Sequence, residues 1–478
     1  MILAIDAGTT GVTALIVDQA GKIVQRGYSE FPQHYPQPGW VEHNLDEIWQ
    51  ATLNSIAQLD LGSVSAVGIT NQRETVGVWD RKTLRPLCPA IVWQDRRTAS
   101  ILEELDAADW VQKLTGLPLD PYFSASKLRW IAKNNGDVWE KVVTGSAVAG
   151  TIDTYLIAKL TNGKAHVTDA SNASRTQLFD IHKGSWSTEL MDLFEIPDSA
   201  LAEVVDSSGV VGITEDFFGL AVPISGIAGD QQAALFGQAQ FKVGGAKCTY
   251  GTGAFILQNT GAEAILLDNG LITTVAWRLD GKLSYANEGS VFVSGAAVQW
   301  LRDELKIIDS SAEIEELALS VTDNGGVVFV PALTGLGAPY WIPDARGTVF
   351  GLTRGTKRGH LARATLEALA FQVRDVFDAM SSTGVKLTGL RVDGGATANN
   401  LLMQIQANLL QLPIERPAQI ESTALGAAYL AGLGIGMWSM EDLAVISSVD
   451  TKFRPVESME DDYLRWKKAV SATIDFSN

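Results

Sequence analysis

The sequence predicts an α/β protein made of two similar halves. Short apolar runs of strand length alternate with longer segments in which apolar residues recur every three or four positions, which is the pattern of strands alternating with helices. A strand, a Gly-Thr turn and a second strand are indicated at 2–18, and the same pattern recurs at 246–259. The 478 residues correspond to about two to four domains. We expect two domains, at 1–238 and 239–478.

The elements of the first half can be placed from their apolar spacing. The residues from Leu45 to Leu59 have helical spacing, with Asn44 as the expected N-cap and Glu47 as the acid of a capping box. The turn Ala7-Gly-Thr-Thr-Gly11 separates the first two strands. Runs with the length and composition of strands lie at 2–6, 12–18, 23–30, 64–70 and 76–80.

Two uncharged stretches of the second half are long enough to be checked as membrane spans. The stretch from Asn324 to Pro343 contains several prolines and glycines, which favours strands and loops. The stretch from Ser422 to Met440 is expected to be a buried helix that ends in a glycine-rich turn. A helix is also indicated around 366–380, ending before Gly384, and a strand at 387–392.

Composition narrows the classes of partner. The chain has 37 Lys+Arg against 55 Asp+Glu and a net charge of -18, which argues against nucleic acid or an anionic membrane as the main partner. The two cysteines, Cys88 and Cys248, suggest neither a disulfide framework nor a metal knuckle, and they fit a reducing compartment. The N-terminal residues lack the features of a signal peptide. We expect a cytoplasmic protein that does not insert into membranes.

The turn after the first strand has features of a phosphate-binding loop, although the common fingerprints are missing. The chain contains neither a Walker A loop nor Gly-x-Gly-x-x-Gly. In Asp6-Ala-Gly-Thr-Thr-Gly11, the glycines allow an anion to approach, and the amides and hydroxyls of Thr9 and Thr10 can donate to phosphate oxygens. Asp6 could hold Mg²⁺ directly or through water. Taken alone, an ordinary hairpin turn is the simpler interpretation.

Two further glycine turns lie in the second half. Tyr250-Gly-Thr-Gly-Ala-Phe255 repeats the first turn, and its Thr252 could meet the other side of a triphosphate. The strand at 387–392 runs into Asp393-Gly-Gly-Ala-Thr-Ala-Asn-Asn400, where a glycine pair would let a base or sugar approach the backbone. Asn399 could cap the following helix or contact the ligand. Each turn alone could be structural, but three in the order phosphate, phosphate, adenosine favour a nucleotide site.

Two long segments give the chain a resemblance to a known family. Tyr122-Phe-Ser-Ala-Ser-Lys-Leu-Arg-Trp-Ile-Ala-Lys-Asn134 resembles the first signature of the FGGY carbohydrate kinases. Gly347-Thr-Val-Phe-Gly-Leu352, continued by His360-Leu361 and Ala364-Thr-Leu-Glu367, resembles the second. The resemblance spans about residues 2–468. It implies two actin/hexokinase-like (ribonuclease H-like) domains with a nucleotide cleft between them.

Within that family, the chain is most similar to members that phosphorylate glycerol. The segments that carry this similarity are 38–43, 68–75, 90–94, 120–124, 172–176 and 226–237. By this resemblance Asp230 is the catalytic base, and the residues that bind the polyol are Arg73, Glu74, Trp93, Tyr122, Asp230, Gln231 and Phe255. The residues that bind the nucleotide and Mg²⁺ are Thr9, Thr10, Gly11, Thr252, Gly295, Gln299, Gly395, Ala396 and Asn399, with Asp6 for the metal. The resemblance also implies ATP as donor, glycerol as acceptor and a homodimer or homotetramer.

The residue types suit a small polyol, which has little apolar surface and must be oriented by hydrogen bonds. Arg73 only donates and Glu74 only accepts, so together they can fix two adjacent hydroxyls. Trp93 and Phe255 can pack on the carbon backbone, and Asp230 can take the proton of the attacking hydroxyl. Without the family context, Arg73 and Glu74 would be interpreted as a solvated ion pair and Trp93 as a core residue.

One part of the first turn departs from the family pattern. Members that phosphorylate glycerol commonly continue this turn as Gly-Thr-Thr-Ser-Ser-Arg, whereas this chain has Gly8-Thr-Thr-Gly-Val-Thr13. A hydroxyl and a cation are therefore missing beside the predicted phosphate site. We expect one phosphate contact to be lost, unless Thr13 replaces part of it.

The loop before the strand that leads to Asp230 is acidic. In some bacterial members that phosphorylate glycerol, a glycine- and arginine-containing loop at this place binds fructose 1,6-bisphosphate. Here the loop is 212–221, and the surrounding residues 184–241 contain nine acids and no Lys, Arg or His. We therefore expect no inhibition by this bisphosphate.

Three alternatives stay open at this point. The substrate could be another small polyol or ketose, such as dihydroxyacetone, erythritol or xylulose. An actin-like polymer or chaperone ATPase would have no use for the cluster of Arg73, Glu74 and Trp93. A sugar-binding regulator without catalysis is disfavoured by the presence of Asp6 and Asp230.

Overall fold

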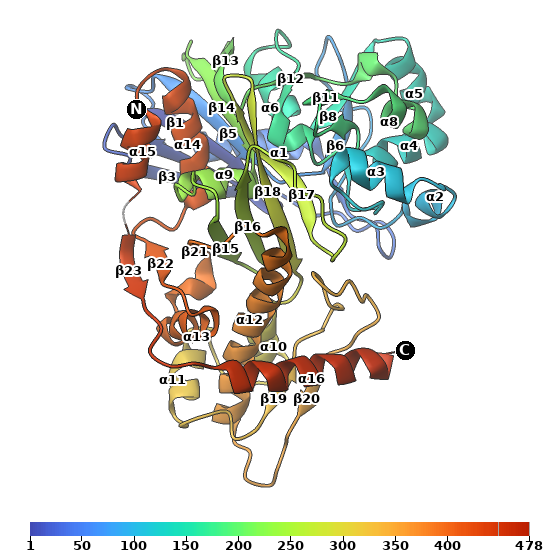
Figure 1. The fold of residues 1–478 in the computed structure, drawn as a ribbon. Coiled ribbons are helices and arrows are strands. Elements are labelled where there is room, and N and C mark those ends of the chain that lie inside the picture. Colours follow the sequence, from blue (N-terminus) through green and yellow to red (C-terminus); the bar gives the residue numbers. More distant parts are fainter. Residues whose placement is uncertain (448, 478) are drawn as a thin grey trace.

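Two mixed β-sheets form the framework of the protein, which the computed structural model describes over residues 1–447 and 449–477 (Figure 1). The strand order in the first sheet is β13 (Ser208–Ile213), β14 (Pro223–Gly229), β5 (Ala66–Asn71), β1 (Ile2–Ala7), β2 (Gly11–Val17) and β3 (Ile23–Glu30). In the second sheet it is β17 (Ile272–Leu279), β18 (Lys282–Val291), β16 (Ala254–Gly261), β15 (Gly245–Tyr250), β21 (Gly389–Asp393), β22 (Ile414–Pro417) and β23 (Val449–Phe453). Helices alternate with these strands, so the predicted α/β class is confirmed.

The two sheets share a central arrangement of strands. In the first sheet, β1 pairs antiparallel with β2 and parallel with β5. In the second, β15 likewise pairs antiparallel with β16 and parallel with β21. The internal repeat predicted at 2–18 and 246–259 is therefore confirmed as two equivalent strand–turn–strand units.

Helices cover both faces of the first sheet. On one face, α1 (Leu45–Ile56) and α6 (Ile152–Leu160) share an apolar core with the strands. On the other face lie α9 (Asp230–Gly237) and α14 (Ser422–Gly434), and α14 packs so closely on β5 that a Cβ at Gly68 would collide with the carbonyl of Ala427. A helix from the C-terminal part of the sequence thus packs on strands of the first half. The division into 1–238 and 239–478 stays a prediction.

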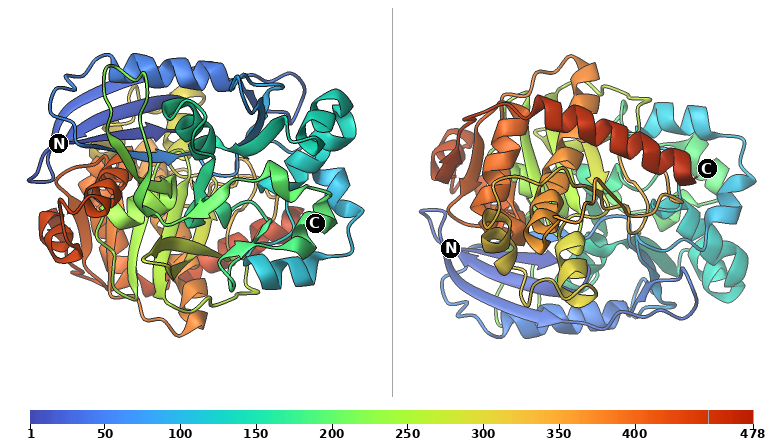
Figure 2. Two further views of the ribbon diagram at one scale, coloured as in Figure 1. Left: turned by 90° about the horizontal axis from the view of Figure 1, so that it is seen from above. Right: turned by 90° about the horizontal axis from the view of Figure 1, so that it is seen from below.

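The second sheet has its own core. This core joins the strands to α10 (Gly295–Asp303), α11 (Glu313–Leu319), α12 (Arg358–Met380) and α13 (Asn400–Leu410). The last helix, α16 (Glu460–Ser477), runs across α12, as the view from below in Figure 2 shows. Trp466 of α16 stacks on Phe371 of α12 with ring centroids 5.4 Å apart. A short ribbon of β19 (Val328–Val330) and β20 (Thr348–Phe350) completes this half.

A smaller sheet extends the first half. Its strands, in spatial order, are β4 (Glu42–His43), β7 (Ala90–Ile91), β6 (Val76–Asp80) and β8 (Ala147–Thr151). The helix α4 (Ser124–Asn134) shares a core with β6 and β8. The remaining elements are α2 (Ala99–Glu103), α3 (Ala108–Thr115), α5 (Gly136–Val143), α7 (Ala170–Ala173), α8 (Thr188–Phe194), α15 (Met440–Ile446), β9 (Val167–Asp169), β10 (Phe179–Asp180), β11 (Ser185–Trp186) and β12 (Glu203–Val205).

Local predictions can be compared with these bounds. The strands expected at 23–30 and 76–80 coincide with β3 and β6. Asn44 caps α1 as expected, because its Oδ1 accepts from the amide of Asp46 at 2.9 Å. The predicted capping box is wrong. The carboxylate of Glu47 pairs instead with the imidazole of His34 at 2.9 Å, and this imidazole competes as a donor with the backbone amide of Asn44.

The two uncharged stretches behave as predicted. Residues 324–343 contain β19 and loops, and 422–440 begin with α14, most of which is buried. Within the described residues, no helix is both long and apolar enough to cross a membrane.

Candidate active site

The carboxyl ends of three parallel strands bring predicted site residues to one edge of the first sheet. β1, β5 and β14 are parallel neighbours, so the segments that follow them lie side by side. β1 leads into the turn with Thr9 and Thr10, β5 leads into Arg73 and Glu74, and β14 leads into Asp230. Residues far apart in sequence therefore meet here.

Asp230 presents an accessible carboxylate at the start of α9. Its Oδ1 accepts a hydrogen bond from the amide of Gln231 at 2.7 Å and forms an ion pair with Nε of Arg73 at 3.0 Å. The side chain of Asp230 is 28% exposed, whereas that of Arg73 is 2% exposed. A carboxylate that is fixed through one oxygen and still accessible can accept a proton from a hydroxyl placed beside it.

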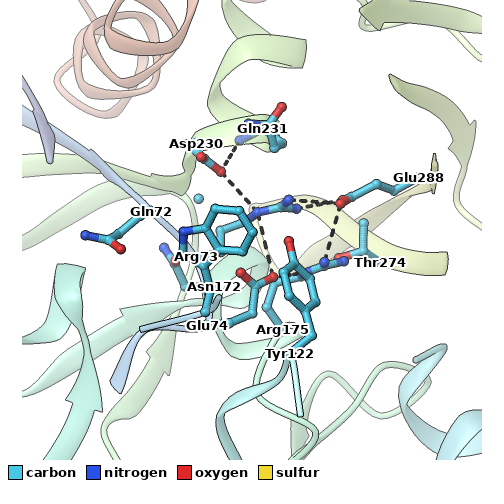
Figure 3. A network of polar contacts seen from close by, with 12 residues as sticks. Gln72, Arg73, Glu74, Tyr122, Asn172, Arg175, Asp230, Gln231, Thr274 and Glu288 are labelled. Atoms are coloured by element: carbon cyan, nitrogen blue, oxygen red, sulfur yellow. Dashed lines mark hydrogen bonds and ion pairs between the residues drawn. The ribbon is translucent and has the colours of Figure 1, made fainter. Parts of the chain in front are cut away.

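Arg73 is buried between two carboxylates (Figure 3). Its Nη1 and Nη2 donate to the two oxygens of Glu288 at 2.6 and 2.9 Å, while its Nε faces Asp230. Glu288 lies on β18, so this contact joins the two sheets. Burial opposes the charge of Arg73, but Glu288, Glu74 and Asp230 together raise the pKa of its guanidinium above its usual value.

A second buried arginine holds Glu74. Nε of Arg175 donates to Oε1 of Glu74 at 2.7 Å, and its Nη2 reaches Oε1 of Glu288 at 3.4 Å. Burial raises the pKa of Glu74. Burial by itself would raise the pKa of Glu288, but the positive charges of Arg175 and Arg73 outweigh this effect and lower the pKa to about 2. In the described part of the chain, Oε2 of Glu74 has no hydrogen-bond partner, so it can accept one from a substrate.

Trp93 and Tyr122 form an aromatic wall beside this network. Their rings meet edge to face, with centroids 5.6 Å apart and an interplanar angle of 90°. The turn that carries Tyr122 is fixed by the buried ammonium of Lys127, which donates to the carbonyls of Pro121, Tyr122 and Phe123 at 2.7, 2.7 and 3.0 Å. Burial lowers the pKa of Lys127 to about 7.

Two other predicted polyol residues contribute no side-chain hydrogen bond to Arg73, Glu74 or Asp230 within the described residues. Phe255 is partly buried on β16, where the strand pairing places it opposite Thr249 and Ser290. The side chain of Gln231 turns toward the second sheet, and its Oε1 accepts a hydrogen bond from the buried ammonium of Lys247. Their roles in binding a polyol stay predictions.

A cavity of about 440 Å³ lies in the second half, within the usual size range of ligand sites. The predicted nucleotide residues that line it are Thr252, Gly295, Gln299, Gly395, Ala396 and Asn399. Apolar walls are supplied by Val298, Ile314, Leu366, Leu369 and Leu402. Apolar side chains and exposed glycine backbone suit a flat base with an attached sugar.

The backbone is closely packed where the glycine turns meet this cavity. A Cβ on Gly295 would lie 2.6 Å from the carbonyl oxygen of Gly251, so a larger residue would push the two turns apart. Asn399 caps α13, because its Oδ1 accepts from the amide of Leu402 at 2.8 Å. The capping alternative for Asn399 is therefore confirmed, and a contact with the nucleotide stays a prediction.

Asp6 lies at the carboxyl end of β1, directly opposite Thr13 of β2. Loss of hydration, with the negative charges of Asp230 and Glu421, raises the pKa of Asp6 to about 8. A nearby cation would favour the ionised form of such a carboxylate. Within the described residues, no group of three or more His, Cys, Asp or Glu is placed to hold a metal. A single carboxylate fits Mg²⁺, which is usually held by one or two carboxylates, water and substrate phosphates.

The turn at Gly11 is covered by an aromatic side chain. A Cβ on Gly11 would lie 2.7 Å from the hydroxyl of Tyr28 on β3. Tyr28 is also the strand partner of Thr13, and its side chain is partly exposed. The phenol of Tyr28 therefore occupies the space that a serine at position 11 would need.

The sequence analysis missed three charged residues of the network. Arg175 lies within a segment that supports the family resemblance, but no role follows for it from spacing alone. Glu288 and Lys247 are single charges inside apolar strands, at Tyr-Ala-Asn-Glu-Gly-Ser and Ala-Lys-Cys-Thr-Tyr. A charge in a buried strand requires a partner, and this signal could have identified both.

Comparison with known proteins agrees with the fold. Residues 1–237 match the N-terminal domain, and 246–435 the C-terminal domain, of the FGGY family of carbohydrate kinases. Glycerol kinase 2 of Thermotoga maritima is 51% identical, with 99% of this chain and 98% of that protein covered. A glycerol kinase of Carboxydothermus hydrogenoformans is 52% identical, with 98% and 97% covered.

Solved structures give the same result. The glycerol kinase of Plasmodium falciparum with ADP superposes with a TM-score of 0.93 at 38% identity, covering 99% of this chain and 98% of that one. A xylulose kinase of Rhodospirillum rubrum, at 24% identity and a TM-score of 0.86, covering 99% of each chain, shows the same fold. The fold class inferred from the sequence, that of the actin/hexokinase-like kinases, is thereby confirmed. The chain belongs to the FGGY family of carbohydrate kinases.

Proposed function

We propose that this protein transfers the γ-phosphoryl group of ATP to glycerol and forms sn-glycerol 3-phosphate. The observation that carries this proposal is the contact of buried Arg73 with accessible Asp230, beside a Glu74 carboxylate that keeps one oxygen free. This arrangement combines a donor, an acceptor and a base within the space of a small polyol. Relatives named glycerol kinase that align over nearly the whole chain support the choice of substrate.

Glycerol would be oriented by hydrogen bonds and limited in length by aromatic walls. Oε2 of Glu74 accepts from one hydroxyl, and a remaining N–H of Arg73 donates to its neighbour. Trp93 and Tyr122 would close one side against the carbon backbone. A longer sugar would have to displace these rings, which gives the site a preference for three-carbon substrates.

The chemical step needs one proton acceptor and good alignment. The terminal hydroxyl of glycerol attacks the γ-phosphorus, the bond from that phosphorus to the β-phosphate oxygen breaks, and ADP leaves. Asp230 takes the hydroxyl proton. The turns with Thr9, Thr10 and Gly11 and with Thr252 would hold the phosphate oxygens, and the cavity would hold the adenosine. Most of the acceleration then comes from positioning and charge stabilisation.

Asp6 is the residue that would hold Mg²⁺ together with the phosphates. The ion would neutralise the negative charge of the phosphates during transfer. We further propose a cytoplasmic homodimer or homotetramer, which light scattering on the purified protein would test.

The experiment that tests the function is a comparison of acceptors under identical conditions. Glycerol, dihydroxyacetone, erythritol and xylulose are each assayed with ATP and Mg²⁺. We expect the highest kcat/KM for glycerol. A higher value for another acceptor would favour the alternative, an FGGY kinase of a different small polyol or ketose.

A further inference from the structure

Glu288 is the one carboxylate of the network that comes from the second half of the chain. It lies on β18 between β16 and β17, in register with Leu257 and Ile272. The side chain is fully buried. Packing in the apolar core around β18 does not explain why a carboxylate stands here, because burying a charge costs free energy unless the charge is paired.

Within the described residues, the hydrogen bonds to the carboxylate of Glu288 all come from two arginines of the first half. Its Oε2 accepts from Nη1 of Arg73 at 2.6 Å, and its Oε1 accepts from Nη2 of Arg73 at 2.9 Å and from Nη2 of Arg175 at 3.4 Å. A bidentate pair of this kind fixes the plane of a guanidinium as well as its position. With both Nη atoms held, Nε of Arg73 lies 3.0 Å from Oδ1 of Asp230, in the ion pair that Figure 3 shows.

The same carboxylate also acts on Glu74 through the second arginine. Arg175 bridges Glu288 and Glu74, and its Nη1 has no hydrogen-bond partner in the described part of the chain. The cations that face the carboxylates here are Arg73, Arg175 and Lys247, against Glu74, Asp230 and Glu288, while Asp393 acts on Lys247 and Asp6 on Asp230. Removal of Glu288 would leave the Nη atoms of Arg73 and Arg175 without the carboxylate that they share.

We propose that Glu288 is a positioning residue of the acceptor site. It orients Arg73 toward Asp230 and, through Arg175, holds Glu74, so that the second half of the chain sets the geometry of a site built by the first half. This inference rests on the proposed function. It predicts that loss of Glu288 affects the polyol much more than the nucleotide, because, within the described residues, the side chains that line the nucleotide cavity do not include those of the network.

The test uses Glu288→Gln, which keeps the size of the side chain. A glutamine can accept through one oxygen only, and its amide N–H₂ would face an arginine donor. We expect kcat/KM for glycerol to fall by about 10- to 100-fold, the usual effect of losing charged hydrogen bonds. Glycerol binding, measured by calorimetry without nucleotide, should weaken as well. The Kd of ADP should stay within about twofold.

Two further variants separate positioning from general destabilisation. Glu288→Asp keeps the charge but shortens the side chain, and it should recover part of the loss. Glu367→Gln removes a carboxylate that pairs with Arg363 at 2.8 Å in α12 and is 5% exposed. This control should lower the Tm without changing the glycerol parameters.

The outcomes are distinguishable. Failure of the unmodified protein to phosphorylate glycerol contradicts the proposed function. An active protein whose Glu288→Gln variant keeps normal glycerol binding and turnover overturns the positioning role. An equal weakening of glycerol and ADP binding also overturns it, because that pattern indicates a structural role. If Glu288→Gln does not fold, Glu288→Asp allows the same comparison of glycerol with ADP.

Discussion

The indole N–H of Trp93 donates a 3.0 Å hydrogen bond to the hydroxyl of Thr9. Trp93 belongs to the aromatic wall of the predicted polyol site, and Thr9 belongs to the predicted phosphate turn. The hydroxyl of Thr9 accepts in this bond, so its own hydrogen remains free to donate. One side chain therefore couples the two predicted substrate sites.

Replacement of Trp93 by phenylalanine should test this coupling. Phe keeps an aromatic wall but cannot donate to Thr9. The loss of a neutral hydrogen bond, about 0.5–1.5 kcal/mol, should raise the KM of ATP by about two- to tenfold. Initial rates at varied ATP and saturating glycerol measure this. An unchanged KM of ATP would show that Thr9 does not need Trp93.

Asp230→Asn should abolish most of the turnover. The variant keeps the size of the side chain and an acceptor for Arg73, but it cannot take up the proton. We expect kcat to fall by about 10²–10⁴-fold, the usual contribution of a general base, while glycerol still binds in calorimetry. Near-normal turnover would exclude Asp230 as the base.

Glu74→Ala should act on the acceptor side. It removes the predicted hydroxyl acceptor and leaves Arg175 without its 2.7 Å partner. We expect the KM of glycerol to rise at least several-fold, since an unpaired buried group costs about 1–3 kcal/mol, and the Tm to fall. The KM of ATP should change little. If only the KM of ATP moved, Glu74 would belong to the nucleotide site.

The topology was predictable from the sequence because it follows from local patterns. The apolar runs fixed β1, β2, β3 and β6 to within about a residue, and the repeated Gly-Thr turn predicted the equivalence of the two sheets. The packing of α14 on the first sheet was not predictable. Its uncharged sequence indicates burial on all sides but does not say against which strands.

Only the site residues that lie within recognisable motifs could be predicted from the sequence. Asp230, Arg73 and Glu74 were recognised from short segments, and the parallel strands place them at one edge. Glu288 was missed because its partners lie far away in sequence and on other elements. The capping box at Glu47 failed for a similar reason, since His34 is a partner that only the fold brings close.

The departure in the first turn can be tested through Gly11 and Tyr28. Gly11→Ser alone should destabilise the protein by about 1–3 kcal/mol, the usual cost of overpacking, because the new side chain meets the phenol of Tyr28. Adding Tyr28→Ala should remove the part of this cost that comes from the phenol, while the carbonyl oxygen of Ser29 stays 2.9 Å from the new Cβ, and it should provide a hydroxyl at the phosphate turn. Thermal unfolding measures the first effect and the KM of ATP the second. Equal Tm values for Gly11→Ser with and without Tyr28→Ala would contradict the steric argument.

The acidic segment 184–241 predicts that fructose 1,6-bisphosphate does not inhibit. Several cations reach this segment and pair with its acids: Lys164 with Glu215 of the loop 212–221, Arg278 with Asp206 at 2.6 Å, Arg129 with Glu195 at 2.9 Å and Arg73 with Asp230 at 3.0 Å. These charges are therefore already neutralised by acids of the segment. A bisphosphate needs charged donors, and each unpaired carboxylate at 4 Å would repel it by about 1 kcal/mol even in water.

This expectation can be tested by titrating fructose 1,6-bisphosphate into the glycerol assay at low salt, where electrostatic attraction is strongest. Rates should stay constant into the millimolar range. Lys164→Glu serves as the matched variant, because it removes the lysine that pairs with Glu215 of the loop and should leave both the rate and the absence of inhibition unchanged. Saturable inhibition that does not compete with ATP, and that disappears in Lys164→Glu, would show that Glu215 releases this lysine to an anion. The ion pair between Lys164 and Glu215 would then be part of a regulatory anion-binding site.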